Sequence, residues 1–231
     1  MRLFLFDLDN TLLEGDSDFA WGQFLIRKGA LERQEEEEKN RRFFAEYEAG
    51  TLDINAFLAF QLAPLAAYPR ATLEAWRAEY VETVVRPMIP ASARALVNRS
   101  LAGKDSLTVM ITATNSFVTA PIAREFGIPH LIATIPECIN GEFTGRAKGI
   151  PSFREGKVNR LEEWLEAQAI HWGNFTESRF YSDSHNDLPL LEKVSHPVAV
   201  NPDPALFKVA KAKKWEILQI RHNNVARTAS L

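Results

Sequence analysis

Residues 1–12 read Met-Arg-Leu-Phe-Leu-Phe-Asp-Leu-Asp-Asn-Thr-Leu, in which four apolar residues are followed at once by two carboxylates. An apolar run as short as Leu3–Phe6 is typical of a strand that is buried on both faces, as in a parallel sheet. Carboxylates packed at the end of such a strand cost free energy unless a cation or hydrogen bonds compensate them. Because ligands of open α/β sheets bind at this end of the strands, Asp7 and Asp9 indicate a site there.

Residues 13–89 have helical patterns and no strand-like alternation. An amphipathic segment over residues 19–26 is followed by Gly29, a typical helix stop. Asp53 fits the N-cap of a further helix, which Pro64 is expected to end. A strand-poor stretch between the first strand and the next one indicates a helical insertion.

From residue 90 onward, helical and strand-like segments alternate. Strands are expected at 107–111, 130–133, 137–139, 179–181 and 197–200, with a turn-rich flap marked by Gly141, Gly145 and Gly149. This alternation predicts an α/β fold with a doubly wound parallel sheet. We expect residues 1–14 and 90–231 to form this Rossmann-like core and residues 15–89 to form an inserted all-helical cap. The polar tail of residues 221–231 is expected to be disordered.

Composition narrows the class of protein. The 231 residues are 46% hydrophobic and 25% charged, which is ordinary for globular proteins and unlike disordered ones. The net charge of −3 gives no basic footprint for nucleic acid, and no apolar run approaches the roughly 18 residues that cross a bilayer. The single cysteine, Cys138, rules out an internal disulfide and suits a reducing compartment. We therefore predict a cytoplasmic monomer or homodimer that binds neither membrane nor nucleic acid.

Polar groups follow three of the predicted strands: Asp7 and Asp9 follow the first, Thr112 a second and Asp183 a third. Right-handed crossovers would bring these strand ends to one edge of the sheet. Asp187 comes four residues after Asp183. A carboxylate cluster of this kind needs a hard cation, and Mg²⁺ suits oxygen ligands with water to spare.

A phosphate group is the ligand that this edge suits best. Lys157 opens the helix that precedes the strand before Asp183. A bound cation, a lysine, the Thr112 hydroxyl and backbone amides at a helix start together match the charge and hydrogen-bonding needs of a phosphate. The expected partner is therefore a small-molecule phosphate ester.

The same residues resemble a known family, the haloacid dehalogenase superfamily of phosphohydrolases. Asp7-Leu-Asp-Asn-Thr11 is similar to its nucleophile motif, and the apolar strand 109–111 closed by Thr112 is similar to its second motif. Lys157 fits the third motif, and Asp183-Ser-His-Asn-Asp187 fits the fourth. The four occur in the family's order over residues 6–187. The form of the fourth motif and the helical insertion resemble the phosphoserine-phosphatase-like branch (subfamily IB), close to bacterial histidinol-phosphatase-type members.

The resemblance implies a role for each acid. Asp7 would be the nucleophile that forms an aspartyl-phosphate, and Asp9 would be the general acid and then the general base. Mg²⁺ would be held by Asp7, Asp183 and the backbone carbonyl of Asp9. Asp187 would hold either the water shell of the metal or Lys157.

The resemblance also implies the groups that bind the phosphate. Lys157 would stabilise both the phosphate and the nucleophile. Thr112 would donate to a phosphoryl oxygen, with help from backbone amides near Leu8 and Ala113. Asn186 would contact the substrate or its phosphate.

Two departures from the branch concern the substrate. The second motif, Thr112-Ala-Thr114, is bulkier than the Ser-Gly-Gly that the branch often carries, so the pocket is expected to be narrower. Asp16 stands nine residues after Asp7, where phosphoserine phosphatases carry a glutamate that binds the substrate's ammonium. An acid there favours an amine-bearing ester, but Asp16 could equally cap the next helix. Arg41 and Arg42 are the candidates for reading a substrate carboxylate.

Three functions are compatible with these features. The first is an Mg²⁺-dependent phosphomonoesterase acting on a small metabolite such as histidinol phosphate or phosphoserine. The second is a phosphotransferase or mutase that uses the same aspartyl-phosphate. The third is a binding module without turnover, which would have no need of an acid/base group two residues after the nucleophile.

Overall fold

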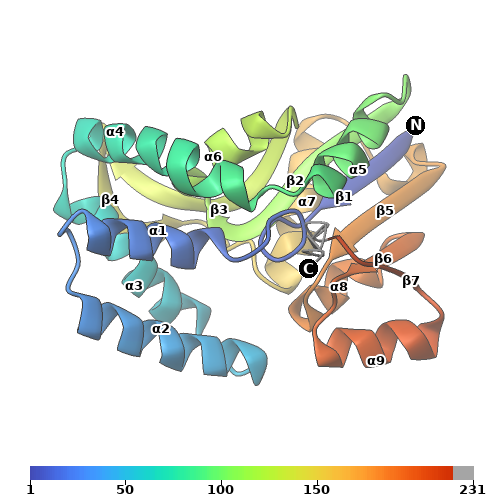
Figure 1. The fold of residues 1–231 in the computed structure, drawn as a ribbon. Helices are drawn as coiled ribbons and strands as arrows, with labels where there is room; N and C mark the ends of the chain where they lie inside the picture. The colour runs from blue at the N-terminus through green and yellow to red at the C-terminus, as the bar shows by residue number, and fades with distance from the viewer. Residues whose placement is uncertain (221–231) are drawn as a thin grey trace, which may run out of the picture.

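A seven-stranded sheet forms the centre of the molecule in the computed structural model, which describes residues 1–220 (Figure 1). The strands are β1 (Arg2–Phe6), β2 (Ser106–Asn115), β3 (His130–Ile139), β4 (Glu142–Lys148), β5 (Glu177–Ser182), β6 (His196–Val200) and β7 (Glu216–Leu218). The helices are α1 (Ser17–Arg27), α2 (Arg33–Glu48), α3 (Ile54–Ala67), α4 (Arg70–Tyr80), α5 (Ala91–Leu101), α6 (Ser116–Glu125), α7 (Glu155–Ala167), α8 (Leu188–Leu191) and α9 (Pro204–Lys213).

The strand order is β4-β3-β2-β1-β5-β6-β7, so β1 lies in the middle, parallel to β2 and β5. Phe6, the last residue of β1, is in register with Met110 and Tyr181. The residues that follow these three positions therefore meet at one edge of the sheet. The predicted α/β sheet is confirmed, except that β4 at the end of the sheet pairs with β3 in the antiparallel sense.

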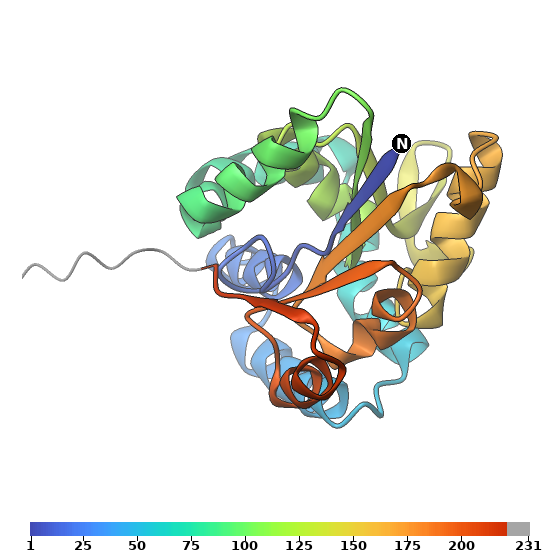
Figure 2. The same ribbon diagram turned by 90° about the vertical axis from the view of Figure 1, so that its right-hand side faces the viewer.

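Helices cover both faces of the sheet, as a doubly wound fold requires (Figure 2). Alternate residues of β1 point to opposite faces, since a strand has a side-chain period of two. Phe4 and Phe6 join the apolar cluster that contains α5 and α6, whereas Leu3 and Leu5 join the cluster formed with α7, α8 and α9. Every one of these β1 side chains is at most 9% exposed, which explains the uninterrupted apolar run in the sequence.

The chain between β1 and α5 contains helices joined by loops and no strand, and it passes over the carboxyl edge of the sheet. Its packing is continuous with the core, because one apolar cluster contains Trp21 and Leu62 from this segment together with Phe6 and Phe117. Trp21 stacks on Phe24 at 5.5 Å between ring centroids and is 2% exposed, so it serves packing. The boundaries of a cap at residues 15–89 stay a prediction.

Three local predictions were wrong. Pro64 lies inside α3, which continues to Ala67, because Pro64 and its neighbour Leu65 are buried and packing outweighs the lost backbone hydrogen bond. The two short strands expected at 130–133 and 137–139 are one strand, β3. The expected flap is β4, in which Gly145 has a positive φ of 78° and would place a Cβ 3.2 Å from Ala66 Cβ of α3.

Within residues 1–220, none of the helices has both the length and the apolar character needed to cross a membrane. The predicted cytoplasmic location stays a prediction. The tail at 221–231 that we expected to be disordered lies outside the described residues.

Candidate active site

Asp7 is the centre of the carboxyl edge of the sheet. It follows β1 directly, and its backbone amide donates to the carbonyl of Tyr181 in β5 at 2.9 Å. Its side chain is 7% exposed. Because β2 and β5 flank β1 in register, Thr112 and Asp183 approach this carboxylate from either side, as the sequence predicts.

Lys157 makes a buried ion pair with two of the predicted acids. Its Nζ lies 2.8 Å from Asp7 Oδ1 and 2.7 Å from Asp187 Oδ2, and the side chain is 3% exposed. The hydroxyl of Ser182 also donates to Asp187 Oδ2 at 2.6 Å. Of the two roles implied for Asp187, the structure shows the contact with Lys157.

The turn before Lys157 fixes where that side chain enters the site. Lys157 lies in the first turn of α7, directly after Gly156. A Cβ at Gly156 would stand 2.1 Å from the carbonyl oxygen of Pro151, so only glycine allows this close approach. The compact turn therefore aims the lysine at Asp7.

Thr11 joins the two carboxylates proposed to hold a metal, a role that the sequence did not reveal. Its hydroxyl lies 3.0 Å from Asp7 Oδ2 and 3.2 Å from Asp183 Oδ1, and it accepts the Asp183 amide at 3.0 Å. This single side chain orients both acids and the loop after β5. The family-like motif at residues 7–11 contains Thr11, but only the fold shows what it contacts.

The site carries more negative charge than its own cation balances. Burial, opposed by Lys157 and reinforced by Asp187, raises the pKa of Asp7 to about 7. Burial, then Asp7 and Asp187, raise the pKa of Asp183 well above its usual value. Burial lowers the pKa of Lys157, but the charges of its two carboxylate partners raise it by a larger amount. The net pKa is above the usual value for lysine, so the side chain stays charged. One lysine thus stands among three acids, of which Asp7 and Asp187 are buried and Asp183 is half-buried.

This donor set fits a hard divalent cation. Asp7 and Asp183 are held side by side by Thr11, and their raised pKa values show that positive charge would be stabilising there. Within residues 1–220, no three Asp, Glu, His or Cys side chains are grouped as an all-side-chain metal site would need. Two carboxylates with a backbone carbonyl and water suit Mg²⁺, which commonly keeps several waters.

Asp9 has a different environment from Asp7. Its Oδ1 accepts the backbone amide of Ser17 at 2.6 Å, and its Oδ2 accepts the hydroxyl of Thr114 at 2.7 Å. Burial, and then the charge of Asp16, raise the pKa of Asp9 to about 7 despite these hydrogen bonds. A carboxyl group with a pKa near neutrality can both give and take a proton, as general acid–base catalysis requires.

Thr112 and Ala113 lie where the pairing of β2 with β3 is interrupted, between Ile111 and Asn115. Such an irregularity re-aims backbone and side chains next to a site. Thr112 is 1% exposed, and its hydroxyl accepts the amide of Thr114 at 3.2 Å. Both residues line the cavity above Asp7, as a phosphate-binding role requires.

Asp16 and Asn186 have structural partners that compete with the roles implied for them. Asp16 is the N-cap of α1, and its Oδ1 accepts the amides of Asp18 and Phe19 at 2.8 Å. The Oδ1 atom of Asn186 accepts a hydrogen bond of 2.9 Å from Nε of Arg154. Both residues line the cavity, so a contact with substrate stays a prediction for each.

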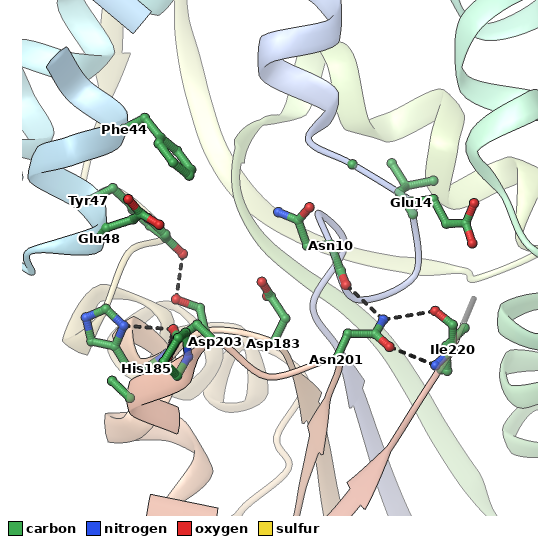
Figure 3. A pocket seen from close by; sticks show the side chains of 15 residues that line it. Asn10, Glu14, Phe44, Tyr47, Glu48, Asp183, His185, Asn201, Asp203 and Ile220 are labelled. Atoms are coloured by element: carbon green, nitrogen blue, oxygen red, sulfur yellow. Dashed lines mark hydrogen bonds and ion pairs between the residues drawn. The ribbon is translucent and has the colours of Figure 1, made fainter. Parts of the chain in front are cut away.

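Helix α2 is tied to the core beside the metal-ligand candidates. The Tyr47 hydroxyl lies 2.7 Å from Ser184 Oγ, and Arg154 donates to the carbonyl of Gly50 at 2.5 Å. Figure 3 shows Asp183 between Tyr47 of α2 and Asn10 of the catalytic loop, facing a cavity of about 700 Å³. Neither Tyr47 nor Arg154 could be identified from sequence, because both act through contacts between distant segments.

A second cavity of about 540 Å³ contains the catalytic candidates. It reaches from Asp7, Asp9 and Lys157 up to the helices α1, α2 and α3. Arg41 lines it, whereas Arg42 lies 3.6 Å from Glu46 on the surface of α2. The arrangement places a candidate nucleophile, a candidate acid/base group, a lysine and two carboxylates that could hold a cation around one cavity.

Comparisons with known proteins agree with this arrangement. The model of the haloacid dehalogenase-like hydrolases matches residues 4–192. A histidinol-phosphatase of Neisseria meningitidis serogroup C is 44% identical over 222 residues, covering 95% of this chain and 99% of that protein. A phosphoserine phosphatase of Mycobacterium tuberculosis is 30% identical over 234 residues, covering 97% of this chain and 72% of that protein.

Solved structures share the fold. A Bordetella pertussis protein described as of unknown function is 47% identical, with a TM-score of 0.88, over 94% of this chain and 97% of that one. A phosphoserine phosphatase described as a phospho-aspartyl intermediate analogue has a TM-score of 0.67 at 17% identity, over 95% and 93% of the two chains. The second likeness is one of fold alone.

Proposed function

Because the chain belongs to the haloacid dehalogenase-like hydrolase family and two of its relatives are named as phosphatases, we propose that it hydrolyses a small phosphate monoester with Mg²⁺ through an aspartyl-phosphate on Asp7. The observation that carries the proposal is the difference between two acids on one loop. Asp7 is clamped by Lys157 and Thr11, whereas Asp9 is held by Ser17 and Thr114 with a pKa near 7.

In the first step, a carboxylate oxygen of Asp7 attacks phosphorus while the bond from phosphorus to the ester oxygen breaks. Asp9 gives its proton to the departing alkoxide, so the alcohol leaves neutral. Lys157 and the Thr112 hydroxyl bind phosphoryl oxygens and keep the group aligned with Asp7. Mg²⁺ bound at Asp7 and Asp183 would neutralise charge on the phosphate, so that an anion can attack an anion.

In the second step, Asp9 takes a proton from water. The water oxygen bonds to phosphorus, and the bond from phosphorus to Asp7 breaks, which returns the free carboxylate and releases inorganic phosphate. The same residue acts first as acid and then as base, which requires its pKa to lie near the working pH. Ser17 and Thr114 hold the Asp9 carboxyl group in place through both steps.

The substrate that we propose is an amine-bearing ester such as histidinol phosphate or phosphoserine. The names of the relatives support this class, since one is a histidinol-phosphatase and another a phosphoserine phosphatase. The acids that line the cavity above Asp9 support it as well.

Metal dependence tests the proposal. The purified protein should release phosphate from p-nitrophenyl phosphate with Mg²⁺, and chelation by EDTA should lower the rate by about a hundredfold or more, because metal stabilisation of phosphoryl transfer is worth several kcal/mol. Added Mg²⁺ should restore the rate of phosphate release.

Two results would count against this function. An equal rate before and after EDTA would contradict the metal. Turnover that begins only when an alcohol acceptor is supplied would show a phosphotransferase instead of a hydrolase. Assays with and without a small alcohol, followed by analysis of the products, separate these outcomes.

A further inference from the structure

The cavity above the catalytic loop is strongly acidic. The carboxylate residues that line it are Asp7, Asp9, Asp16, Asp18, Glu37, Asp183 and Asp187. The cationic residues that line it are Lys157, which is committed to Asp7 and Asp187, and Arg41, which is exposed. Even with a divalent cation at the catalytic end, the end that receives the leaving alcohol has an excess of negative charge.

Asp18 is the most deeply buried acid at that end. It lies in the first turn of α1, lines the cavity and is 4% exposed. Among residues 1–220, its side chain accepts one hydrogen bond, a long one of 3.4 Å from Asn115 Nδ2 to Oδ1. Asn115 is itself the N-cap of α6, where its Oδ1 accepts the amide of Val118 at 3.2 Å.

Asp16 differs from Asp18 both in its burial and in its hydrogen bonds. It is exposed, and one of its oxygens already accepts two backbone amides as the cap of α1. The Oδ2 atom of Asp18 has no hydrogen-bond partner within the described part of the chain, and the side chain has little contact with water. Of the two acids, Asp18 therefore gains more from a cation supplied by a ligand.

A second buried acid, Glu36 of α2, packs against α1. It is 7% exposed, and a Cβ at Gly22 of α1 would stand 2.9 Å from Glu36 Oε1. Asn40 donates to Glu36 at 3.1 Å. Burial, then the charges of Asp16, Asp9 and Glu36, raise the pKa of Asp18 well above its usual value. No ion pair of Asp18 or Glu36 with a lysine or arginine occurs within the part of the chain that is described.

The wall next to these acids is aromatic. Phe43, Phe44, Tyr47 and Phe57 line the cavity from α2 and α3, and Phe153 lines it from the loop before α7. Aromatic faces attract cations and pack against flat rings, and they offer nothing to a carboxylate. The surface around the leaving alcohol thus suits an organic cation.

We propose that Asp18 binds the cationic nitrogen of the leaving alcohol and that the acidic lining excludes a carboxylate, so that the substrate is the phosphate ester of an amino alcohol and not of an amino acid. This inference rests on the proposed phosphatase function. It assigns binding of the amine to Asp18 instead of Asp16. Of the two substrates left open by the sequence, it favours histidinol phosphate over phosphoserine.

A matched pair of esters tests the substrate class. O-Phosphoethanolamine and O-phosphoserine differ only by a carboxylate, and p-nitrophenyl phosphate reports the chemistry common to all esters. We expect kcat/KM for O-phosphoethanolamine to exceed that for O-phosphoserine by at least about tenfold, because like charges at a buried contact repel strongly. L-Histidinol phosphate, a larger amino alcohol ester, should be better still. Equal or higher kcat/KM for O-phosphoserine would overturn the proposal.

The isosteric variant Asp18→Asn tests the residue. We expect its kcat/KM for L-histidinol phosphate, relative to that for p-nitrophenyl phosphate, to fall by about ten- to a hundredfold through KM, as loss of a charge-assisted hydrogen bond implies. Asp16→Asn should change this ratio less. Glu38→Gln, which removes one charge from the exposed side of α2, is the control and should leave it unchanged.

Three results would overturn the role of Asp18: a larger effect of Asp16→Asn, a ratio unchanged in Asp18→Asn, or a parallel fall for both esters, which would mark Asp18 as structural. Calorimetric binding of L-histidinol, the product alcohol, separates this inference from the proposed function. Binding that weakens in Asp18→Asn, in a protein that hydrolyses none of the esters, would refute the phosphatase and keep the amine site. Hydrolysis of the esters with no preference for amines would keep the phosphatase function and refute the amine site.

Discussion

Replacement of Asp7 by asparagine should lower kcat for phosphate release by roughly 10⁴-fold or more, the scale seen when a catalytic nucleophile is removed. The amide has the same shape but cannot form an acyl phosphate, so the effect is on chemistry and not on folding. The variant should fold at least as well as the parent, because Asp7 is a buried acid among other acids. Phosphate release and thermal unfolding, measured on the same preparation, check both expectations.

Asp105→Asn is the matched control for this substitution. Asp105 is exposed, and within residues 1–220 its carboxylate pairs with the amino group of Met1 alone, so the same chemical change there should leave kcat unaltered. An Asp7→Asn protein with activity close to that of the parent would refute the assignment of the nucleophile. An unfolded variant would show that the carboxylate is needed for the structure.

Lys157→Met should both inactivate and destabilise the protein. Its Nζ is the shared partner of Asp7 and Asp187, all of them nearly inaccessible to water. Removing one member of a buried ion pair commonly costs about 3–5 kcal/mol, because the remaining charge is left buried without compensation. Chemical denaturation in the presence of EDTA measures this loss of unfolding free energy, and the phosphate assay measures the loss of activity.

A double variant identifies the cause of the lost stability. Lys157→Met combined with Asp187→Asn removes the lysine and one of its acids, so it should be more stable than Lys157→Met alone while staying inactive. Lys39→Met, which removes an exposed lysine paired with Glu35, is the control and should change stability by less than about 1 kcal/mol. If the double variant is no more stable than the single one, the electrostatic explanation is wrong.

The sequence allows prediction of those parts of the site that local pattern encodes. The apolar run of β1 and the acids that follow it are adjacent in the chain, so strand, edge and candidate nucleophile could be inferred together. Parallel pairing then places Thr112 and Asp183 beside Asp7, since register follows once the strands are known. Lys157 needed the family resemblance, because a lone lysine at a helix start is usually a solvated residue.

Other features depend on contacts between segments that no local pattern specifies. Thr114 holds Asp9 across 105 positions of the chain, and Arg154 reaches Gly50 across 104. Pro64 continues a helix because of burial that the sequence does not display. Asp16 illustrates the limit: from sequence it could equally contact substrate or cap the next helix. The structure shows the cap, and it places Asp18 of the same helix as a buried acid in the cavity.

Capture of the covalent intermediate tests the central claim most directly. In an Asp9→Asn protein the nitrophenolate of p-nitrophenyl phosphate can leave without a proton, but water lacks its general base, so the phosphoryl-enzyme should accumulate. We predict a burst of one nitrophenolate per active site, followed by slow turnover. Mass spectrometry of the acid-quenched protein should locate one phosphoryl group on the peptide that carries Asp7. A phosphoryl group on another residue, or steady turnover with no phosphorylated protein, would contradict the account.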